Sequence, residues 1–452
     1  MSEAIFSEFR SFVEAEVARR RVPGVAIGLL HDGQEHVAAF GVTSVDNPLA
    51  VDENTLFQVG SITKTFTATA AMRLVDDGRL DLDRPVRSYL PDLRLSDPAV
   101  AATVTPRHLL THTAGWVGDH FSDTGRGDDA LARYVAEMAD LDQLTPPGAL
   151  YSYSNSGFSL LGRVIEVLTG ETFEAALKWL VLAPLGLEHS FLFPEEAMTQ
   201  RFAVGHAGVR EGRPHVLQPW HIPRSATPAG GLIASVRDQL HYARFHMGDG
   251  TGATGERVLA ATTLAAMRQP VVPSTGLPSR AIGLAWNIGK NTISHGGGTY
   301  GQSTFLMVCP DHGVALSVLT NADIGAEVGG AAATWVLERL VGVSSPQTAV
   351  IPVAGEVLDR CAGLYRCVLE DIELGRLGEA LVARQISKGG FPTKDTPPQS
   401  DALPLMRFGF YAQDRLVGLD PPFLDTRAEL IRGPAGDVEW LRFGGRIRRC
   451  AR

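Results

Sequence analysis

The most informative segment of this chain is Gln58-Val59-Gly60-Ser61-Ile62-Thr63-Lys64-Thr65-Phe66-Thr67, where a strand-like run gives way to an apolar helical pattern. A helix that begins at Ser61 places Ser61 and Lys64 one turn apart on the same face. The N-terminus of a helix favours negative charge, such as the charge on an attacking alkoxide. A lysine one turn later can take the hydroxyl proton if burial keeps its amine neutral. The segment therefore predicts a serine nucleophile with a lysine base.

Lysine is rare in this chain, which gives Lys64 more weight. Only five of the 41 Lys and Arg residues are lysines, at positions 64, 178, 290, 388 and 394. A chain that uses arginine almost everywhere retains lysine where a group must be able to lose its proton. The Ser-x-x-Lys pattern alone also fits a capped helix with a surface lysine, so the interpretation depends on two further motifs.

The second motif is Tyr151-Ser152-Tyr153-Ser154-Asn155-Ser156-Gly157-Phe158. It follows the turn Pro146-Pro147-Gly148 and precedes a helical pattern that starts at Ser159. Tyr153 and Asn155 are therefore expected on a tight loop, with their polar side chains directed into a cleft. A tyrosine can pass a proton to a leaving group, and an asparagine can bind a substrate amide or the lysine. Alone, this motif also fits a turn with a half-buried tyrosine.

The third motif is Ser294-His295-Gly296-Gly297-Gly298-Thr299-Tyr300-Gly301, between two strand-like runs. Small residues after the histidine let a substrate backbone lie close to the main chain, so we expect His295 in the site and Gly296 and Gly297 as substrate-binding residues. Taken by itself, the motif also fits a glycine-rich hairpin turn with a surface histidine. A lipase oxyanion loop would need a Gly-x-Ser-x-Gly elbow after it, and the chain contains none.

In this order, the three motifs resemble the serine β-lactamase and penicillin-binding-protein superfamily, on its class C and esterase side. The segments Thr105 to Gly115 and Ala229 to Ser235 are also similar to that family. The resemblance implies an α/β fold, with an antiparallel sheet flanked by helices and an all-helical lobe, as in class C β-lactamases. The third motif has His295 where many penicillin-recognising members have lysine. This departure favours an esterase, peptidase or acyl-transfer enzyme over a β-lactamase.

The resemblance also implies a role for each residue of the motifs. Ser61 is expected to attack an acyl carbonyl, with Lys64 as base and Tyr153 carrying the proton to the leaving group. Asn155 and His295 would position the substrate or tune the lysine. The oxyanion would rest on the N–H of Ser61 and on an N–H of the strand near Gly297.

The domain organisation follows from changes in pattern along the chain. Residues 1–345 are expected to form the catalytic domain, with an N-terminal helix over residues 1–22, a hairpin over 25–40 and a mostly helical segment over 56–280. Strands are expected to return over 284–319, before a helix over 331–340. Residues 346–356 read as a linker. Short apolar runs broken by Gly and Pro then predict a small β-barrel over 357–452, and the family resemblance implies that this barrel is lipocalin-like.

Composition limits which binding partners and which cellular compartment are expected for this protein. A net charge of −9 disfavours nucleic acid, and four cysteines are too few for a disulfide framework, so reduced thiols are expected. No apolar run suits a membrane span or a signal peptide, so a cytoplasmic protein with no membrane association is expected. No cofactor or metal is expected either. Gly250 to Gly255 follows a helix-like segment rather than a strand, and His108 and His112 have no evident third ligand.

The barrel, the length, the missing export signal and the arginine-rich end also resemble stand-alone penicillin-binding-protein-type thioesterases. These take a nonribosomal peptide from its carrier-protein thioester onto serine and close it into a ring. The terminal arginines are Arg442, Arg446, Arg448, Arg449 and Arg452. Such a cluster is more often a solvated face, but Arg446 would bind a substrate carboxylate if the barrel reaches the cleft. The alternatives are an esterase, a D-amino-acid-specific peptidase or amidase, a β-lactamase, or a protein that only binds peptides.

Overall fold

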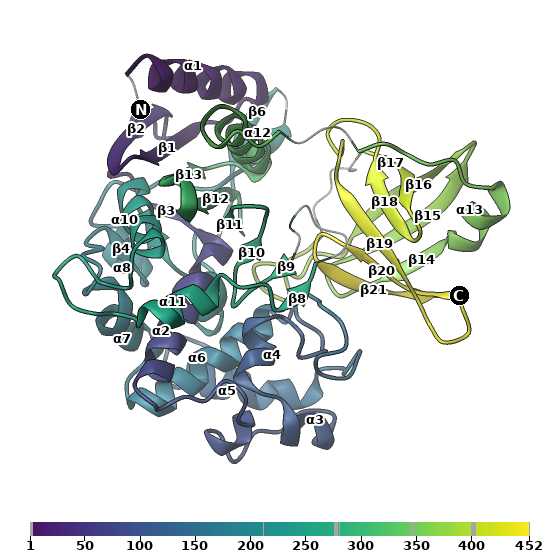
Figure 1. Cartoon of the computed structure of the whole chain (residues 1–452), viewed down its shortest axis with the longest axis horizontal. Coiled ribbons are helices and arrows are strands. Elements are labelled where there is room, and N and C mark those ends of the chain that lie inside the picture. Colours follow the sequence, from purple (N-terminus) through teal and green to yellow (C-terminus); the bar gives the residue numbers. More distant parts are fainter. Residues whose placement is uncertain are drawn as a thin grey trace.

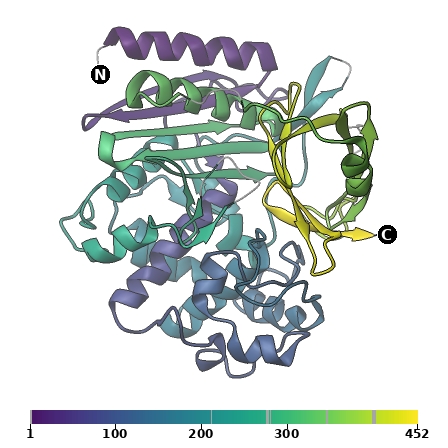
Figure 2. The ribbon, with the colours of Figure 1, turned by 45° about the vertical axis from the view of Figure 1, so that its right-hand side comes forward.

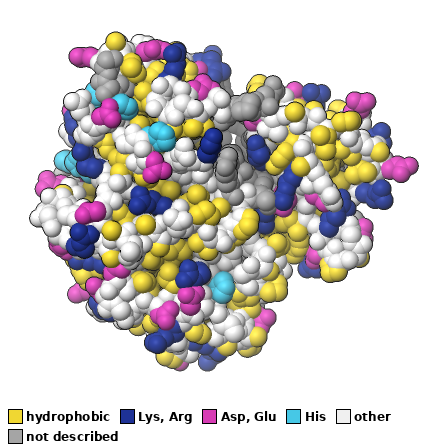
Figure 3. All heavy atoms as spheres, in the orientation of Figure 1, with side chains coloured by type: hydrophobic (Ala, Val, Ile, Leu, Met, Phe, Trp, Pro, Cys, Tyr) yellow, Lys and Arg dark blue, Asp and Glu magenta, His cyan; other side chains and the backbone are white. Residues whose placement is uncertain are grey.

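The computed structural model describes residues 3–210, 212–274, 279, 281–344, 348–398 and 404–451. It contains an α/β body and a C-terminal barrel that packs against one side of the body (Figures 1 and 2). In the space-filling view, basic side chains lie on the barrel near the seam between the two parts (Figure 3). The predicted boundary at 345–357 stays a prediction, because residues 345–347 lie outside the described residues.

An eight-stranded antiparallel sheet forms the centre of the body, in the order β2-β1-β13-β12-β11-β10-β9-β8. Its strands are β1 (Gly24–His31), β2 (Gln34–Gly41), β8 (Val272–Pro273), β9 (Ala281–Ile282), β10 (Asn287–Ile288), β11 (Ile293–Thr299), β12 (Gln302–Cys309) and β13 (Val314–Thr320). The predicted N-terminal hairpin is confirmed, and its first strand pairs with β13, so that Val25 lies opposite Thr320. Segments from the two ends of the body therefore build one sheet.

Helices cover both faces of this sheet. α1 (Glu3–Arg20) and α12 (Ala326–Val336) lie on one face, where Phe9 packs on Trp335 with ring centroids 5.0 Å apart (Figure 2). α10 (Val236–Met247) packs on the other face. The predicted N-terminal helix is confirmed, and the predicted helix over 331–340 is present but begins earlier, at Ala326. No helix among the described residues is both long and apolar enough to span a bilayer.

The segment between the strands forms a mostly helical lobe, as predicted. Its helices are α2 (Thr63–Asp76), α3 (Pro98–Thr103), α4 (Pro106–Leu110), α5 (Ala130–Glu137), α6 (Asn155–Thr169), α7 (Phe173–Leu177), α8 (Pro194–Ala197), α9 (Thr227–Gly230) and α11 (Ala261–Met267). A small sheet of β3 (Phe57–Gln58), β7 (Ile233–Ala234) and β4 (Ser190–Phe191) and the hairpin β5 (His206–Arg210) and β6 (Arg213–Val216) were not predicted. The strands of the small sheet have only two residues each and are too short to show an alternating pattern.

The C-terminal part is a closed barrel, as predicted, preceded by α13 (Gly355–Cys361). Its strands are β14 (Gly363–Arg366), β15 (Glu370–Leu377), β16 (Ala380–Ser387), β17 (Met406–Ala412), β18 (Arg415–Gly418), β19 (Arg427–Arg432), β20 (Val438–Phe443) and β21 (Arg446–Ala451). The sequence did not reveal β15 or β21, whose many charged residues mask the alternation. All four cysteines of the chain are free thiols.

The interpretation of the terminal arginines as a solvated face is wrong for three of them. Arg442 and Arg448 are only 4% and 1% exposed and form ion pairs with Glu429 and Glu370. The Arg448 guanidinium also donates to the Phe443 carbonyl at 2.7 Å. The Arg442 guanidinium donates to the Tyr151 carbonyl of the body at 3.1 Å, and both arginines can be buried because carboxylate and carbonyl groups pair with them. Arg446 points toward the body, Arg449 is exposed, and Arg452 lies outside the described residues.

We predict that Arg448→Met destabilises the barrel whereas Arg449→Met does not. Removing one partner of a buried ion pair costs about 3–5 kcal/mol, because the remaining Glu370 carboxylate has no counterion. The apparent melting temperature should fall by about 10 °C in Arg448→Met and stay near the wild-type value in the control variant Arg449→Met. Equal melting temperatures for the two variants, measured by circular dichroism, would show that the buried pair does not hold β21 in place.

Candidate active site

Ser61 lies in a 3-10 turn, Gly60–Ile62, that leads directly into α2. Gly60 has a φ of +53°, and a Cβ at this position would lie 2.6 Å from the Gly298 nitrogen. Only glycine therefore lets the nucleophile turn approach β11 so closely. On the neighbouring strand, the Thr304 hydroxyl donates to the Val59 carbonyl at 2.8 Å and ties the turn to the sheet.

The Lys64 amine is fully buried and lies within hydrogen-bond distance of three oxygens. Nζ is 2.7 Å from Asn155 Oδ1, 2.5 Å from the Ala229 carbonyl and 3.1 Å from Ser61 Oγ. A neutral amine has two N–H donors and one lone pair. The first two oxygens can only accept, so the lone pair is left for the Ser61 hydroxyl proton. This is the geometry of a general base.

Burial lowers the pKa of Lys64 well below its usual value. The positive charge of Arg446 lowers this pKa further, and the negative charge of Asp119 opposes the shift. Burial therefore favours the neutral amine, and the hydrogen-bonding pattern is compatible with that form.

Tyr153 lies beside the lysine on the segment that leads into α6. Its ring centroid is 4.8 Å from Lys64 Nζ and 4.9 Å from Arg446 Cζ, and the ring stacks on His112 with centroids 4.5 Å apart. Burial raises the pKa of Tyr153, and the Ser61 side chain and Arg446 offset part of that rise. The phenol is therefore neutral at pH 7. It lies where it can carry a proton between Ser61 and a leaving group.

Asn155, the first residue of α6, links the lysine to an aspartate that the sequence did not reveal. Its Nδ2 donates to Asp119 Oδ1 at 2.7 Å while its Oδ1 faces Lys64. Asp119 is only 7% exposed. It is a single acidic residue in a loop, with no pattern around it, and only the tertiary structure places it in the site.

Arg446, the first residue of β21, reaches from the barrel to the same aspartate. Its Nε donates to Asp119 Oδ2 at 2.5 Å and its Nη2 to Asp119 Oδ1 at 3.1 Å. The Tyr153 N–H donates to the Gly445 carbonyl at 2.8 Å, so the β20–β21 turn is bonded to the segment that carries the tyrosine. Arg446 thus lies at the site, as the resemblance implied, but two of its donors are engaged by a carboxylate of this chain.

His295 is 4% exposed, and its Nδ1 lies 2.6 Å from the Gly296 carbonyl. Burial and the nearby Lys64 lower the pKa of His295 to about 4, so its imidazole is neutral at pH 7. Gly297 packs against the nucleophile turn, because a Cβ there would lie 1.9 Å from the Val59 carbonyl. On β11, the residues that wall the cavity at Ser61 are Gly298 and Thr299 rather than Gly296 and Gly297.

A cavity of about 320 Å³ opens at Ser61 and takes its walls from both parts of the molecule. It is lined by Ser61, Phe121, Asn155, Ile222, Ala226, Ala229, Gly230, Gly298, Thr299, Leu369, Phe391 and Arg446. The last three belong to the barrel. Phe391 meets Phe121 edge-on with centroids 4.9 Å apart, and the Lys394 N–H donates to the Phe121 carbonyl at 2.8 Å. A barrel loop therefore closes one side of an apolar cleft.

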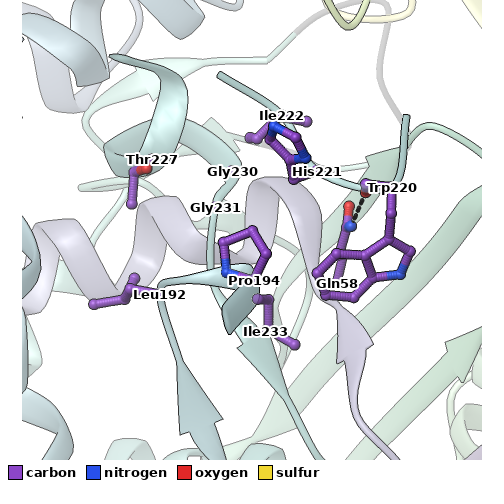
Figure 4. Close-up of a pocket in the computed structure, with 10 residues that line it drawn as sticks. All are labelled: Gln58, Leu192, Pro194, Trp220, His221, Ile222, Thr227, Gly230, Gly231 and Ile233. Carbon is purple, nitrogen blue, oxygen red and sulfur yellow. Dashed lines mark hydrogen bonds between the residues drawn. The ribbon is translucent and has the colours of Figure 1, made fainter. Parts of the chain in front are cut away.

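A second, much smaller pocket shares Ile222 and Gly230 with this cavity (Figure 4). Its walls include Gln58 and Trp220, and the Gln58 side-chain amide donates to the Trp220 carbonyl. At about 20 Å³ it has room for little more than a water molecule, so it is not a substrate pocket. In the part of the chain that the structure describes, no cluster of three His, Cys, Asp or Glu side chains is arranged to hold a metal ion.

We predict that Gly297→Ala slows the reaction of Ser61 whereas Gly296→Ala does not. The added methyl group at position 297 would displace the nucleophile turn, but at position 296 the nearest atom lies 3.9 Å away. The rate of labelling by a fluorophosphonate probe should fall by about tenfold or more in Gly297→Ala. Equal labelling rates in the two variants, both folded, would contradict this account of the turn.

We predict that Lys64→Met removes most of the activity of a correctly folded protein. Loss of a general base typically costs a factor of about 10²–10⁴ in rate. The loss should appear as slow fluorophosphonate labelling of Ser61, with Ser61→Ala as the unlabelled control. Labelling of Lys64→Met at the wild-type rate would exclude the lysine as base.

Comparison with known proteins agrees with this geometry. Residues 9–340 match the Beta-lactamase family model. The chain is 38% identical over 354 residues to penicillin-binding protein 4 of Amycolatopsis lactamdurans, over 76% of this chain and 93% of that protein. It is 29% identical over 237 residues to a β-lactamase of Pseudomonas fluorescens, over 52% of this chain and 63% of that protein.

Solved structures match both parts of the molecule. The crystal structure of SurE superposes with a TM-score of 0.75 and 28% identity, over 98% of this chain and 99% of that chain. A structure of SurE with D-Leu covers 100% of both chains with the same TM-score and identity. A class C β-lactamase mutant, at 22% identity and a TM-score of 0.62, covers 74% of this chain and 98% of its own and shares the fold. The chain belongs to the β-lactamase and penicillin-binding-protein family of serine hydrolases.

Proposed function

We propose that this protein is a penicillin-binding-protein-type thioesterase that releases a nonribosomal peptide from its thioester and closes it into a ring. The observation that carries the proposal is the shared cavity at Ser61. Leu369, Phe391 and Arg446 of the barrel wall a cleft that holds the nucleophile of the body. The peptide would arrive on a peptidyl carrier protein in the cytoplasm.

The proposed reaction has two acyl-transfer steps. In the first, Ser61 Oγ attacks the thioester carbonyl and Lys64 takes the hydroxyl proton. As the carbon–sulfur bond breaks, Tyr153 gives its proton to the departing thiolate and is reprotonated by Lys64. The oxyanion is held by the N–H of Ser61 and by an N–H of β11, each donor being worth about 3 kcal/mol in the transition state. In the second step, the amine of the peptide attacks the Ser61 ester. Its proton returns to Ser61 Oγ through Tyr153 and Lys64.

Ring closure requires the amine of the peptide to compete with water. The mostly apolar walls of the cleft, with Phe121 against Phe391, limit the access of water to the ester. An amine on the same chain has an effective concentration far above that of a free nucleophile, about 10⁵ M or more when it is well oriented. The barrel loop that carries Phe391 would therefore favour ring closure over hydrolysis.

The comparisons support a substrate with a D-configured residue at the acyl position. SurE shares the barrel as well as the body with this chain, and one of its structures contains D-Leu. We propose that the residue esterified to Ser61 has the D configuration.

A simple esterase, or a D-amino-acid-specific peptidase or amidase, is the second candidate. It would use the same Ser61, Lys64 and Tyr153, with water as the acceptor. The D-Leu in the SurE structure is compatible with this activity too. The two candidates differ in the product that leaves the acyl-enzyme.

We predict that the protein cyclises a short peptidyl thioester that has a free amine and a D-configured C-terminal residue. Mass spectrometry should show a product lighter than the linear acid by one water, absent with Ser61→Ala. If the acyl position takes a D residue as proposed, the same peptide with an L-configured C-terminal residue should react at least about tenfold more slowly. Formation of the linear acid alone would contradict the cyclase proposal and favour the hydrolase.

We predict that Phe391→Ala increases the share of linear acid in the product several-fold, because it opens the cleft to water. Leu377→Ala, at a 65% exposed position elsewhere on the barrel, serves as the matched control. The ratio of cyclic to linear product, measured by mass spectrometry, should change only in Phe391→Ala. An unchanged ratio would show that the Phe391 loop does not control water.

A further inference from the structure

We propose that Asp119 is a positioning residue that couples the barrel to the catalytic lysine. It would fix the orientation of the Asn155 amide toward Lys64 and hold Arg446 beside the cleft. The proposal concerns the acylation of Ser61, a step that a cyclase and a hydrolase share. It rests on the proposed function only for the identity of the nucleophile.

The first step of the argument is the orientation of the Asn155 amide. An ionised carboxylate can only accept hydrogen bonds, so Asp119 Oδ1, at 2.7 Å, must face the NH₂ end of the amide. The oxygen end then faces Lys64 Nζ, also at 2.7 Å. A flipped amide would direct its NH₂ group at the N–H bonds of the lysine. Asp119 therefore determines which atom of Asn155 the base meets.

The second step is the ion pair between Asp119 of the body and Arg446 of the barrel. Arg446 donates to both oxygens of Asp119, from Nε at 2.5 Å and from Nη2 at 3.1 Å. Two-pronged pairs between arginine and carboxylate are strong and geometrically specific. The Asp119 side chain is only 7% exposed, so solvent screens this pair little. This ion pair joins two segments that are far apart in the sequence and belong to different parts of the fold.

The third step is the charge around the lysine. The polar and titratable side chains that face Lys64 come from the Gly60–Ile62 turn, α6, β11 and the loops before α6. They are Ser61, His112, Tyr153, Asn155 and His295. The pKa of His112 is lowered well below its usual value and that of His295 to about 4, both chiefly by burial, and burial raises the pKa of Tyr153. These groups are neutral at pH 7.

The charged groups that act on the Lys64 amine are therefore Asp119 and Arg446. Asp119 stabilises the protonated amine and raises the pKa of Lys64, whereas Arg446 destabilises it and lowers this pKa. Because the lysine acts as a base only when neutral, the acid limb of the rate profile follows this pKa. Loss of Asp119 and loss of Arg446 should then move the limb in opposite directions.

The experiment measures the rate of fluorophosphonate labelling of Ser61 in the full-length protein between about pH 5 and 10. In Asp119→Asn, the acid limb should move to lower pH by roughly one unit, because the protonated lysine loses a counter-charge. In Arg446→Gln, the limb should move to higher pH by a similar amount. Asp119→Glu, which restores the charge, should return the limb most of the way to the wild-type position.

Several outcomes would overturn the proposal. The coupling would be contradicted if the acid limb of the pH–rate profile stayed in place in both Asp119→Asn and Arg446→Gln. It would also be contradicted if the acid limb moved in the same direction in both variants. A reduced fraction of labelled protein with an unchanged limb would mean that Asp119 has only a structural role. Labelling of Ser61→Ala would remove the nucleophile on which the proposal rests. Because the probe needs no amine or thioester, a failure to form cyclic peptide would leave this test unaffected.

Discussion

A lysine amine without access to solvent lies at the centre of this structure, and three helices converge on it. Ser61 lies in the 3-10 turn directly before α2, Asn155 is at the start of α6, and the Ala229 carbonyl belongs to α9. Burying an ammonium group is costly, whereas a neutral amine needs only two acceptors and one donor. The site supplies this set, with Nζ between 2.5 and 3.1 Å from each partner. The packing of the helical lobe thus produces a base beside the nucleophile.

The barrel takes part in this site instead of being a separate appendage. Its β20–β21 turn is bonded to the segment that carries Tyr153, and Arg446 is paired with Asp119 of the body. Within the barrel, the ion pair of Arg442 with Glu429 joins the neighbouring strands β20 and β19, and the ion pair of Arg448 with Glu370 joins β21 to β15. A buried ion pair does not add much stability, but it favours one register, since a shifted strand would leave a charge unpaired. The position of Arg446 therefore depends on the whole of β21.

Much of the fold and the core of the site followed from local sequence patterns. Ser61 and Lys64 are one helical turn apart, so their contact was predictable from spacing alone, and the three motifs come together as expected. The barrel followed from short apolar runs broken by Gly and Pro, and the antiparallel sheet was implied by the family resemblance. What remained hidden depends on tertiary contacts. Asp119 and the Ala229 carbonyl have no pattern of their own, and β21 has three arginines among its six residues, of which Arg446 and Arg448 pair with carboxylates on other segments.

The protonation state of Lys64 tests the central claim most directly. The chain has five lysines, so protein labelled with ¹³C at the lysine ε carbon should give few resonances, and Lys64→Met identifies the one of interest. The account predicts that this resonance titrates well below the ordinary lysine pKa of about 10.4. A Lys64 resonance that titrates at the ordinary value would mean that the amine is charged at neutral pH and cannot be the base.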